Sequence, residues 1–135
     1  METQLIFHHI GIACHDISRT KAFYLAMGYE EHPVVDDPLQ HVRVCFMDQP
    51  GAPRLELLEP LDEQSPILRT LKVAGVSPYH FCYEVQDIDT AIASLRKERF
   101  LLLSGPVPAC ALNNRQVAFL YHKNNGLIEL VEMSR

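Results

Sequence analysis

The segment HIGIACHDI at residues 9–17 recurs as HFCYEVQDI at residues 80–88, and this repetition decides the fold. In both segments a histidine is followed seven residues later by Asp-Ile. A second pair, LELLE at residues 55–59 and IELVE at residues 128–132, repeats the pattern apolar-Glu-Leu-apolar-Glu. The histidines lie 71 residues apart and the first glutamates 73, so the two halves have nearly equal length. We interpret this pattern as a tandem duplication.

The first half predicts one strand, one helix and three further strands. Residues 5–13 are apolar and rich in strand-forming residues. Asp16 or Ser18 can cap a helix that carries Ala22, Phe23 and Ala26 on one face and stops at Gly28. Short segments rich in Val, Leu, Phe and Cys follow as strands, separated by turn clusters at 36–38 and 49–51; they are residues 29–35, 41–47 and 54–59.

The second half repeats this order. Residues 79–85 predict a strand, and residues 88–99 predict a helix with Ile88, Ala91, Ile92 and Leu95 facing inward. The last three strands are expected at residues 100–103, 116–121 and 127–131. In the segment between the halves, Ser65-Pro66 predicts the start of a short joining helix.

The sequence therefore predicts an α+β fold made of two tandem βαβββ modules, with a curved mixed sheet around a central metal-binding cavity. A length of 135 residues fits one domain. We expect a single domain over residues 1–135, with the first module at 5–60, a linker helix within 61–77 and the second module at 78–132.

Composition excludes several classes of protein. The net charge of -5 and the absence of a basic run longer than Arg96-Lys97 argue against nucleic acid or an anionic membrane as partner. Without a signal-like N-terminus or a long apolar run, a cytoplasmic location is expected. The four cysteines show no close spacing; Cys14, Cys45 and Cys82 lie in apolar runs and are predicted to be buried, reduced thiols.

His9 and His80 occupy equivalent positions on the first strand of each half, and Glu56 and Glu129 on the last strand. Because strands alternate faces, the Leu residues beside each glutamate should face the other side of the sheet. Two carboxylates pointing inward are costly to bury unless they are paired, protonated or bound to a cation, and two imidazoles beside them complete a metal shell. We therefore predict one divalent metal ion held by all four residues. Two nitrogen and two oxygen ligands suit Zn, Co, Ni, Mn or Fe(II), and an octahedral ion would keep two positions open for chemistry.

Other polar residues are interpreted as follows. Glu59 and Glu132 also repeat, and we expect them to face solvent or to end the strand. Arg115 precedes a strand and is a candidate for holding a substrate carboxylate or phosphate, although a solvated loop arginine would fit the sequence equally well.

These motifs together resemble the vicinal oxygen chelate superfamily, which includes glyoxalase I, methylmalonyl-CoA epimerase, extradiol dioxygenases and bleomycin-resistance proteins. The resemblance covers essentially the whole chain and is closest to the epimerase and glyoxalase I-like branch, through HIGIA (9–13), ELLEP (56–60), HFCYEV (80–85) and GLIEL (126–130). In that branch the metal ligands fall on His9, Glu56, His80 and Glu129. Some epimerases carry a second carboxylate on the third strand, but residues 42–46 contain no acid.

The resemblance implies a reaction type. The metal binds the carbonyl oxygens of the substrate, the adjacent C-H loses its proton, and the resulting enolate is held by the metal. We expect Glu129, with Glu56 on the opposite side, to act as general base. The leading interpretation is a metal-dependent epimerase of an acyl thioester, with a homodimer as the expected assembly.

Two alternatives stay open. A glyoxalase I-type lactoylglutathione lyase would use the same enolate chemistry on a hemithioacetal, and a non-enzymatic binding protein could share the fold. An extradiol dioxygenase would need a site of two histidines and one carboxylate, which the fourth ligand disfavours.

Overall fold

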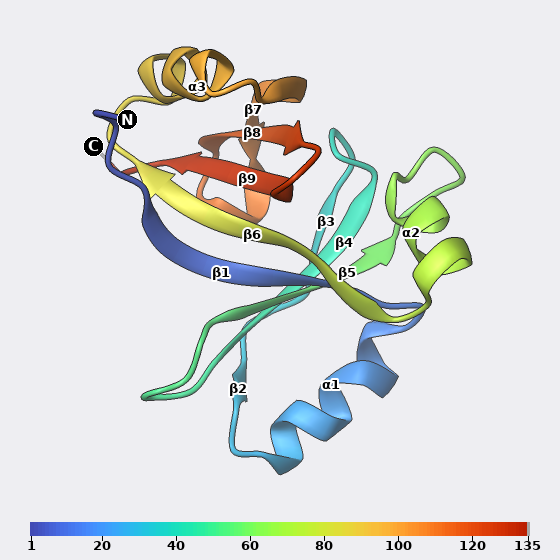
Figure 1. Cartoon of the computed structure of the whole chain (residues 1–135). Helices are drawn as coiled ribbons and strands as arrows, with labels where there is room; N and C mark the ends of the chain where they lie inside the picture. Colours follow the sequence, from blue (N-terminus) through green and yellow to red (C-terminus); the bar gives the residue numbers. More distant parts are fainter. Residues whose placement is uncertain (135) are drawn as a thin grey trace. The chain divides into compact units, whose positions relative to one another are not determined.

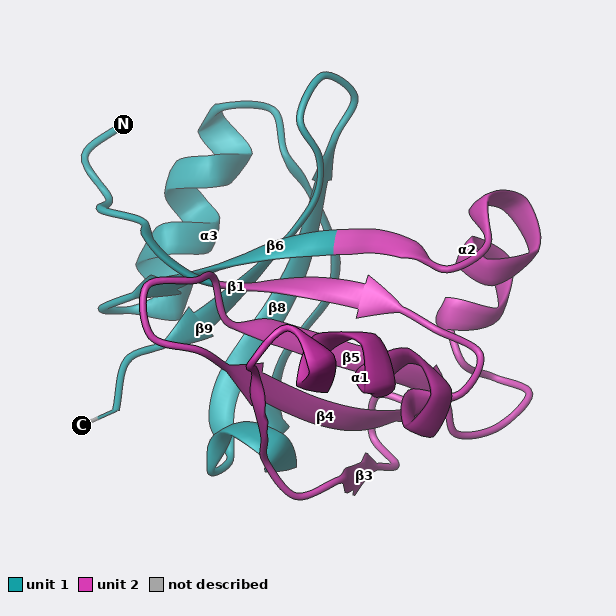
Figure 2. Ribbon diagram, turned by 90° about the horizontal axis from the view of Figure 1, so that it is seen from below, with its two compact units in different colours: residues 1–8, 80–135 teal, residues 9–79 magenta. Residues whose placement is uncertain are grey.

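The computed structural model describes residues 1–134, which contain nine strands, three α-helices and one 3-10 turn at Cys110–Leu112. The chain divides into two compact units, and each contains part of these elements (Figure 2). One unit is residues 9–79, and the other combines residues 1–8 with the chain from residue 80 onward. The boundaries therefore cut through the first strand of each repeat. The expectation of a single domain stays a prediction.

The unit of residues 9–79 follows the predicted order of strand, helix and strands (Figure 1). Its strand order is β2-β4-β5-β1, with β3 paired to β4. β1 runs parallel to β5, whereas the other pairs are antiparallel. The elements are β1 (Ile6–Ala13), α1 (Ile17–Ala26), β2 (Glu30–Glu31), β3 (Val35–Asp37), β4 (Val42–Asp48), β5 (Leu55–Pro60) and α2 (Ile67–Ala74).

The other unit has the same plan, with strand order β6-β9-β8-β7. Its first and last strands, β6 and β9, are parallel, and the remaining pairs are antiparallel. The elements are β6 (Ser77–Val85), α3 (Ile88–Lys97), β7 (Leu101–Ala109), β8 (Arg115–His122) and β9 (Gly126–Glu132). The predicted α+β fold with mixed strand pairing is confirmed.

Two strands differ from the prediction. The strand expected at residues 29–35 is reduced to Glu30–Glu31, and β3 occupies residues where a turn was expected. Pro33 has no N–H to donate and therefore interrupts the pairing. The strand expected at residues 100–103 runs on to Ala109 through two prolines, which is tolerated because β7 lies at the edge of the strand order.

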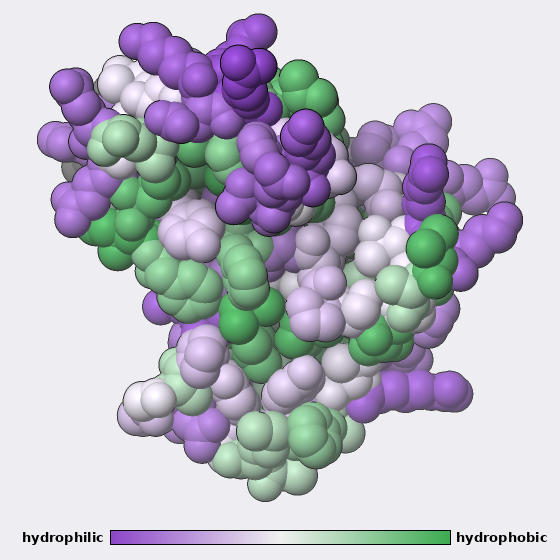
Figure 3. Space-filling view, viewed as in Figure 1, coloured by the Kyte–Doolittle hydropathy of each residue, from purple (hydrophilic) through white to green (hydrophobic). Residues whose placement is uncertain are grey.

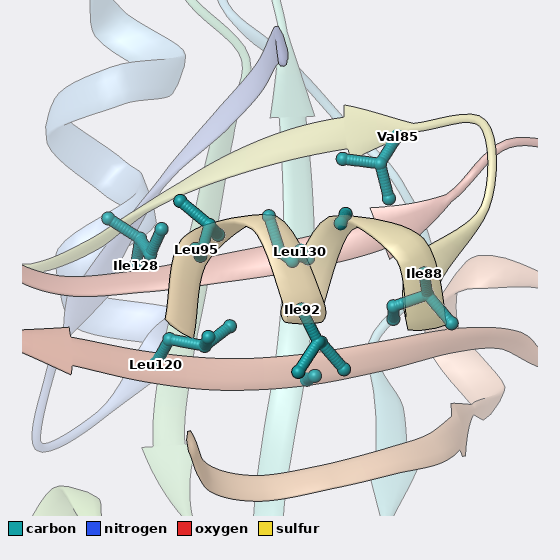
Figure 4. Close-up of a cluster of buried hydrophobic side chains, with 9 residues drawn as sticks. Val85, Ile88, Ile92, Leu95, Leu120, Ile128 and Leu130 are labelled. Atoms are coloured by element: carbon teal, nitrogen blue, oxygen red, sulfur yellow. The ribbon is translucent and has the colours of Figure 1, made fainter. Parts of the chain in front are cut away.

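One face of each unit packs against its helix. In the unit of residues 9–79, Leu55 and Leu57 are buried in this core with Ile17 of α1, so the leucines beside Glu56 do face away from it, as predicted. In the other unit the inward face of α3 packs onto β8 and β9 (Figure 4); it consists of the predicted residues Ile88, Ala91, Ile92 and Leu95.

The face predicted for α1 is not a packing face. Ala22, Phe23 and Ala26 are exposed, and Phe23 keeps 66% of its surface in contact with solvent. The helix contacts the core instead through Ile17 at its start and through Tyr24. A helix of ten residues that contacts the core through one residue near each end needs no complete apolar face, which is why the sequence periodicity was misleading.

The Asp-Ile signature marks the start of each helix. Asp16 caps α1 by accepting from Arg19 N, and Asp87 caps α3 by accepting from Thr90 N. The joining helix is also confirmed: Ser65 Oγ accepts from the backbone N–H of Ile67 at 3.3 Å. The isoleucine after each aspartate is buried in the core. The repeat thus encodes the turn from strand to helix.

Glu59 and Glu132 lie at the ends of their strands, as one half of the prediction had it, but they do not face solvent freely. Glu59 Oε1 accepts from the backbone N–H of Ile17 at 2.8 Å, and Glu132 Oε2 accepts from that of Ile88 at 3.0 Å. Each is half-buried and accepts a hydrogen bond from a backbone N–H of the first helical turn, which has no partner within the helix. Each therefore links the last strand of its half to the start of the helix by a hydrogen bond.

Removing one of these carboxylates should measurably destabilise the fold. We expect Glu132→Ala to lower the free energy of unfolding by about 1–2 kcal/mol, because a hydrogen bond to a charged acceptor is lost at a half-buried helix end. Urea unfolding followed by circular dichroism measures the change. Glu98→Ala, at an exposed position, is the matched control and should change stability little; an equal loss in both variants would contradict the capping role.

Gly105 is required by a close contact between β7 and β8. It has φ +86°, and a Cβ placed there would lie 2.4 Å from Val117 O. We expect Gly105→Ala to cost at least about 2 kcal/mol, from the positive φ together with the clash. Thermal unfolding measures the loss, with Gly51→Ala as control, since Gly51 also has positive φ but meets nothing within 4 Å. Equal losses would show that φ alone matters.

Cys14, Cys45 and Cys82 are buried as predicted, and the four cysteines form no disulfide within residues 1–134. Burial raises the pKa of the Cys14 thiol to about 11, so it stays protonated and packs as a small apolar side chain. Within the same residues, the helices are too short and too polar to cross a membrane.

Candidate metal centre

In the unit of residues 9–79, the first strand and the last strand bring a histidine and a glutamate together. β1 and β5 are parallel, with Ile10 opposite Leu55 and Gly11 opposite Glu56. His9 Nε2 lies 3.2 Å from Glu56 Oε1, and the two side chains are 0% and 7% exposed. Both side chains are therefore almost completely removed from solvent.

The other unit contains the same pair in the same register. Phe81 lies opposite Ile128 and Cys82 opposite Glu129 in the parallel pair of β6 and β9. His80 Nε2 lies 3.0 Å from Glu129 Oε1, and these side chains are 0% and 4% exposed. The sequence repeat is therefore a repeat of side-chain geometry as well.

A phenylalanine ring packs against the histidine of each pair. The ring of Phe46 stands edge-on to the His9 ring at 5.2 Å between centroids, and the ring of Phe119 stands in the same way against His80 at 5.2 Å. Phe46 lies opposite Glu56 in the β4–β5 pair, and Phe119 lies opposite Glu129 in the β8–β9 pair. Each phenylalanine thus limits the rotation of its imidazole.

Sequence reasoning missed these phenylalanines, although the repeat contains them. Phe46 and Phe119 are 73 residues apart, the same separation as the two glutamates. They were overlooked because an aromatic residue within an apolar strand normally indicates core and carries no chemistry of its own.

The geometry of each pair suits a cation. Adjacent ligands on an octahedral ion with bonds of about 2.1 Å lie about 3.0 Å apart, close to both observed separations. Burying a carboxylate costs several kcal/mol unless positive charge compensates it. Each His–Glu pair therefore fits half of a shell of two nitrogen and two oxygen ligands. A protonated imidazole bonded to the carboxylate is the competing arrangement within each pair.

Arg115 is not a solvated loop residue. It begins β8, its side chain is 16% exposed, and its Nη1 donates to Glu84 Oε2 at 2.8 Å. Its Nη2 lies 3.3 Å from His8 Nε2, which must accept because a guanidinium has donors only. Arg115 is thus a half-buried cation already held by a carboxylate, and its predicted substrate contact stays a prediction.

The unit of residues 9–79 contains one further buried acid within the residues described. Asp37, at the end of β3, accepts from the backbone N–H of Gln40 at 3.2 Å and from its side-chain amide at 2.7 Å. Both carboxylate oxygens are occupied in closing the turn between β3 and β4. Asp37 is therefore a structural residue and does not supply the acid missing from β4.

Comparison with known proteins supports the family resemblance. A family model described as the glyoxalase/bleomycin resistance protein/dioxygenase superfamily matches residues 8–119. The mitochondrial methylmalonyl-CoA epimerase of Homo sapiens is 35% identical over 129 residues, which cover 91% of this chain and 71% of that protein. The ethylmalonyl-CoA/methylmalonyl-CoA epimerase of Cereibacter sphaeroides is 33% identical over 132 residues, covering 93% and 96%.

A solved structure agrees with these relatives. A variant of the Streptomyces coelicolor methylmalonyl-CoA epimerase, in complex with 2-nitronate-propionyl-CoA, superimposes with a TM-score of 0.83 at 30% identity. The match covers 98% of this chain and 100% of that one. The chain therefore shares both fold and sequence with acyl-CoA epimerases over nearly its full length.

Proposed function

Because the chain belongs to the glyoxalase/bleomycin resistance protein/dioxygenase superfamily, we propose that it is a metal-dependent epimerase of an acyl-CoA thioester related to methylmalonyl-CoA. The observation that carries the proposal is the buried His–Glu pair that each half builds in the same register. The methylmalonyl-CoA epimerases among its relatives supply the reaction class.

The first part of the proposal is that His9, Glu56, His80 and Glu129 together bind one divalent ion. The equivalent positions of the two pairs in the repeat support this, since a duplicated sequence supplies ligands in matched sets. A bound divalent ion would supply positive charge where negative charge develops on the carbonyl oxygens of the substrate. The identity of the ion is left to elemental analysis, with Zn, Co, Ni, Mn and Fe as the candidates.

The second part assigns the proton transfer. His9 and His80 are neutral ligands whose rings are fixed by Phe46 and Phe119, so we assign them a holding role. A carboxylate oxygen of Glu129 takes the α-proton from one face of the substrate, and Glu56 transfers a proton at the opposite face. The aromatic rings and the near-complete burial of both pairs exclude water that would compete for this proton.

The third part concerns Arg115. A substrate that carries a free carboxylate could form a bidentate contact with its guanidinium only by competing with Glu84. We therefore propose Arg115 as a positioning residue for that carboxylate. The proposal predicts that Arg115→Lys raises KM more than it lowers kcat, because a point charge replaces a planar fork.

Proton exchange tests the function directly. The purified protein, loaded in turn with each candidate metal, is incubated in D2O with one enantiomer of methylmalonyl-CoA, and NMR follows loss of the α-proton and appearance of the other enantiomer. The proposal expects both. Turnover of methylglyoxal with glutathione, and not of the thioester, would favour the lyase instead, and binding without turnover would favour the non-enzymatic alternative. Light scattering on the same sample tests the predicted homodimer.

A further inference from the structure

Four basic side chains at one end of α3 lack carboxylate partners within residues 1–134. Elsewhere in the described chain, most basic residues are paired: Arg19, Lys21, Arg43, Arg54 and Arg115 each face an acid. The exposed residues without such a pair are Arg69 and Lys72 on α2, and Arg96, Lys97, Arg99 and Lys123. We call the last four the basic end of α3.

A ring contact brings the two segments of this cluster together. The rings of Phe100 and His122 are 5.0 Å apart and tilted by 41°, which places Arg99 and Lys123, their chain neighbours, at the same end of the unit. Arg99 has φ +71°, a conformation that non-glycine residues rarely adopt. Figure 3 shows hydrophilic side chains gathered at the top of the molecule, where Figure 1 places α3.

The local charge opposes that of the whole chain. Glu98 is the single acid within residues 96–100, so this end carries an excess of positive charge in a chain of net charge -5. Arg96 and Lys97 lie in the last turn of α3, where basic residues favour the helix dipole. Arg99 and Lys123 lie beyond the helix, and this structural explanation does not extend to them. Concentrated positive charge on an acidic protein attracts a polyanion.

We infer that the basic end of α3 binds the phosphorylated nucleotide of the acyl-CoA substrate. This inference rests on the proposed function and names the part of the molecule that holds the carrier. Because Asn124 N donates to His122 Nδ1 at 3.0 Å, the neutral ring carries its proton on Nε2 and offers a further donor for phosphate. The Phe100–His122 pair adds an aromatic surface for the adenine ring.

The distance between Glu129 and the basic end of α3 allows one substrate molecule to contact both. Phe119 lies opposite Glu129, and His122 lies opposite Gly126, in the same β8–β9 pair. Three residues of strand span roughly 10 Å, at about 3.3 Å per residue. Because successive side chains alternate, His122 shares the α3 face of the sheet with Leu120, whereas Phe119 points to the opposite face. The pantetheine arm of coenzyme A therefore joins the thioester to its phosphates by passing around the turn between β8 and β9.

Charge reversal tests the inference with a matched control. The double variant Arg99→Glu/Lys123→Glu is compared with Arg69→Glu/Lys72→Glu on α2, which changes net charge equally and also breaks no ion pair among residues 1–134. We expect the first variant to raise KM for methylmalonyl-CoA about tenfold, from lost electrostatic attraction, and the second to change it little. With the N-acetylcysteamine thioester of methylmalonate, which lacks the nucleotide, both variants should match the wild type.

A direct binding measurement separates this inference from the proposed function. Calorimetry with adenosine 3′,5′-bisphosphate should show binding to the wild type and to the α2 variant, and about tenfold weaker binding to Arg99→Glu/Lys123→Glu. Equal affinity in all three proteins, or a loss confined to the α2 variant, overturns the inference. If the wild type epimerises neither thioester, the proposed function fails, and the calorimetry alone decides whether the nucleotide site exists.

Discussion

Replacing Glu129 by glutamine is expected to slow α-proton exchange with D2O by about 10²–10⁴-fold for the enantiomer whose α-proton faces Glu129, the usual contribution of a general base. The amide keeps the shape of the side chain and an oxygen that can ligate a cation, but it cannot accept a proton. Glu129 is 4% exposed and lies 3.0 Å from His80 Nε2, so bulk solvent has little access to replace it as the base. NMR in D2O measures the exchange, and elemental analysis verifies that the ion is still bound.

Glu56→Gln is the informative comparison, because Glu56 has the same position in the other half. If the two carboxylates serve opposite faces of the substrate, each variant should retain exchange with one enantiomer and lose it with the other. Glu63→Gln, at an exposed position outside the two pairs, should leave exchange near the wild-type rate. Exchange at the wild-type rate with both enantiomers in Glu129→Gln, with metal present, would show that Glu129 is not the base.

The parts of the fold that could be predicted are those where the repeat constrained the interpretation. Asp16 was one of two candidate caps in the sequence, and the repeat extends this role to Asp87, since each lies seven residues after a histidine and caps a helix in the structure. The packing face of α1 was not recognisable, since Phe23 looks like a core residue in the sequence and is exposed in the structure. Helix periodicity identifies the most apolar face of a helix. In α1 the face that packs is instead the one with Ile17 and Tyr24, because these residues contact the core on the sheet.

The same contrast holds for the candidate site. The proximity of His9 to Glu56 and of His80 to Glu129 was predictable, because strand alternation and duplication both place each pair on one face. The capping role of Glu59 and Glu132 was not, because it depends on where the helix start lies relative to the end of the last strand. That distance is set by the packing of helix on sheet, which the repeat in the sequence does not encode.

Removing either imidazole is expected to abolish tight metal binding. Changes to residues that merely support a ligand already lower affinity by about 10–100-fold, so His9→Ala and His80→Ala should each lower it by more than about 100-fold. Their effects should be similar, since both rings have the same partner geometry at 5.2 Å from a phenylalanine. Competition with a chromogenic chelator measures affinity, and His32→Ala, at an exposed histidine paired with Asp48, is the control.

Stoichiometry decides whether the two His–Glu pairs act together. One shared ion predicts one metal per wild-type chain and almost none in either His→Ala variant at the same metal concentration. Two independent ions would give two per chain in the wild type and one in each variant, which would contradict the shared site. The thermal stability of the wild type should rise with metal concentration, whereas that of the variants should not. An ion that binds the native state stabilises the fold substantially only when its concentration exceeds its dissociation constant.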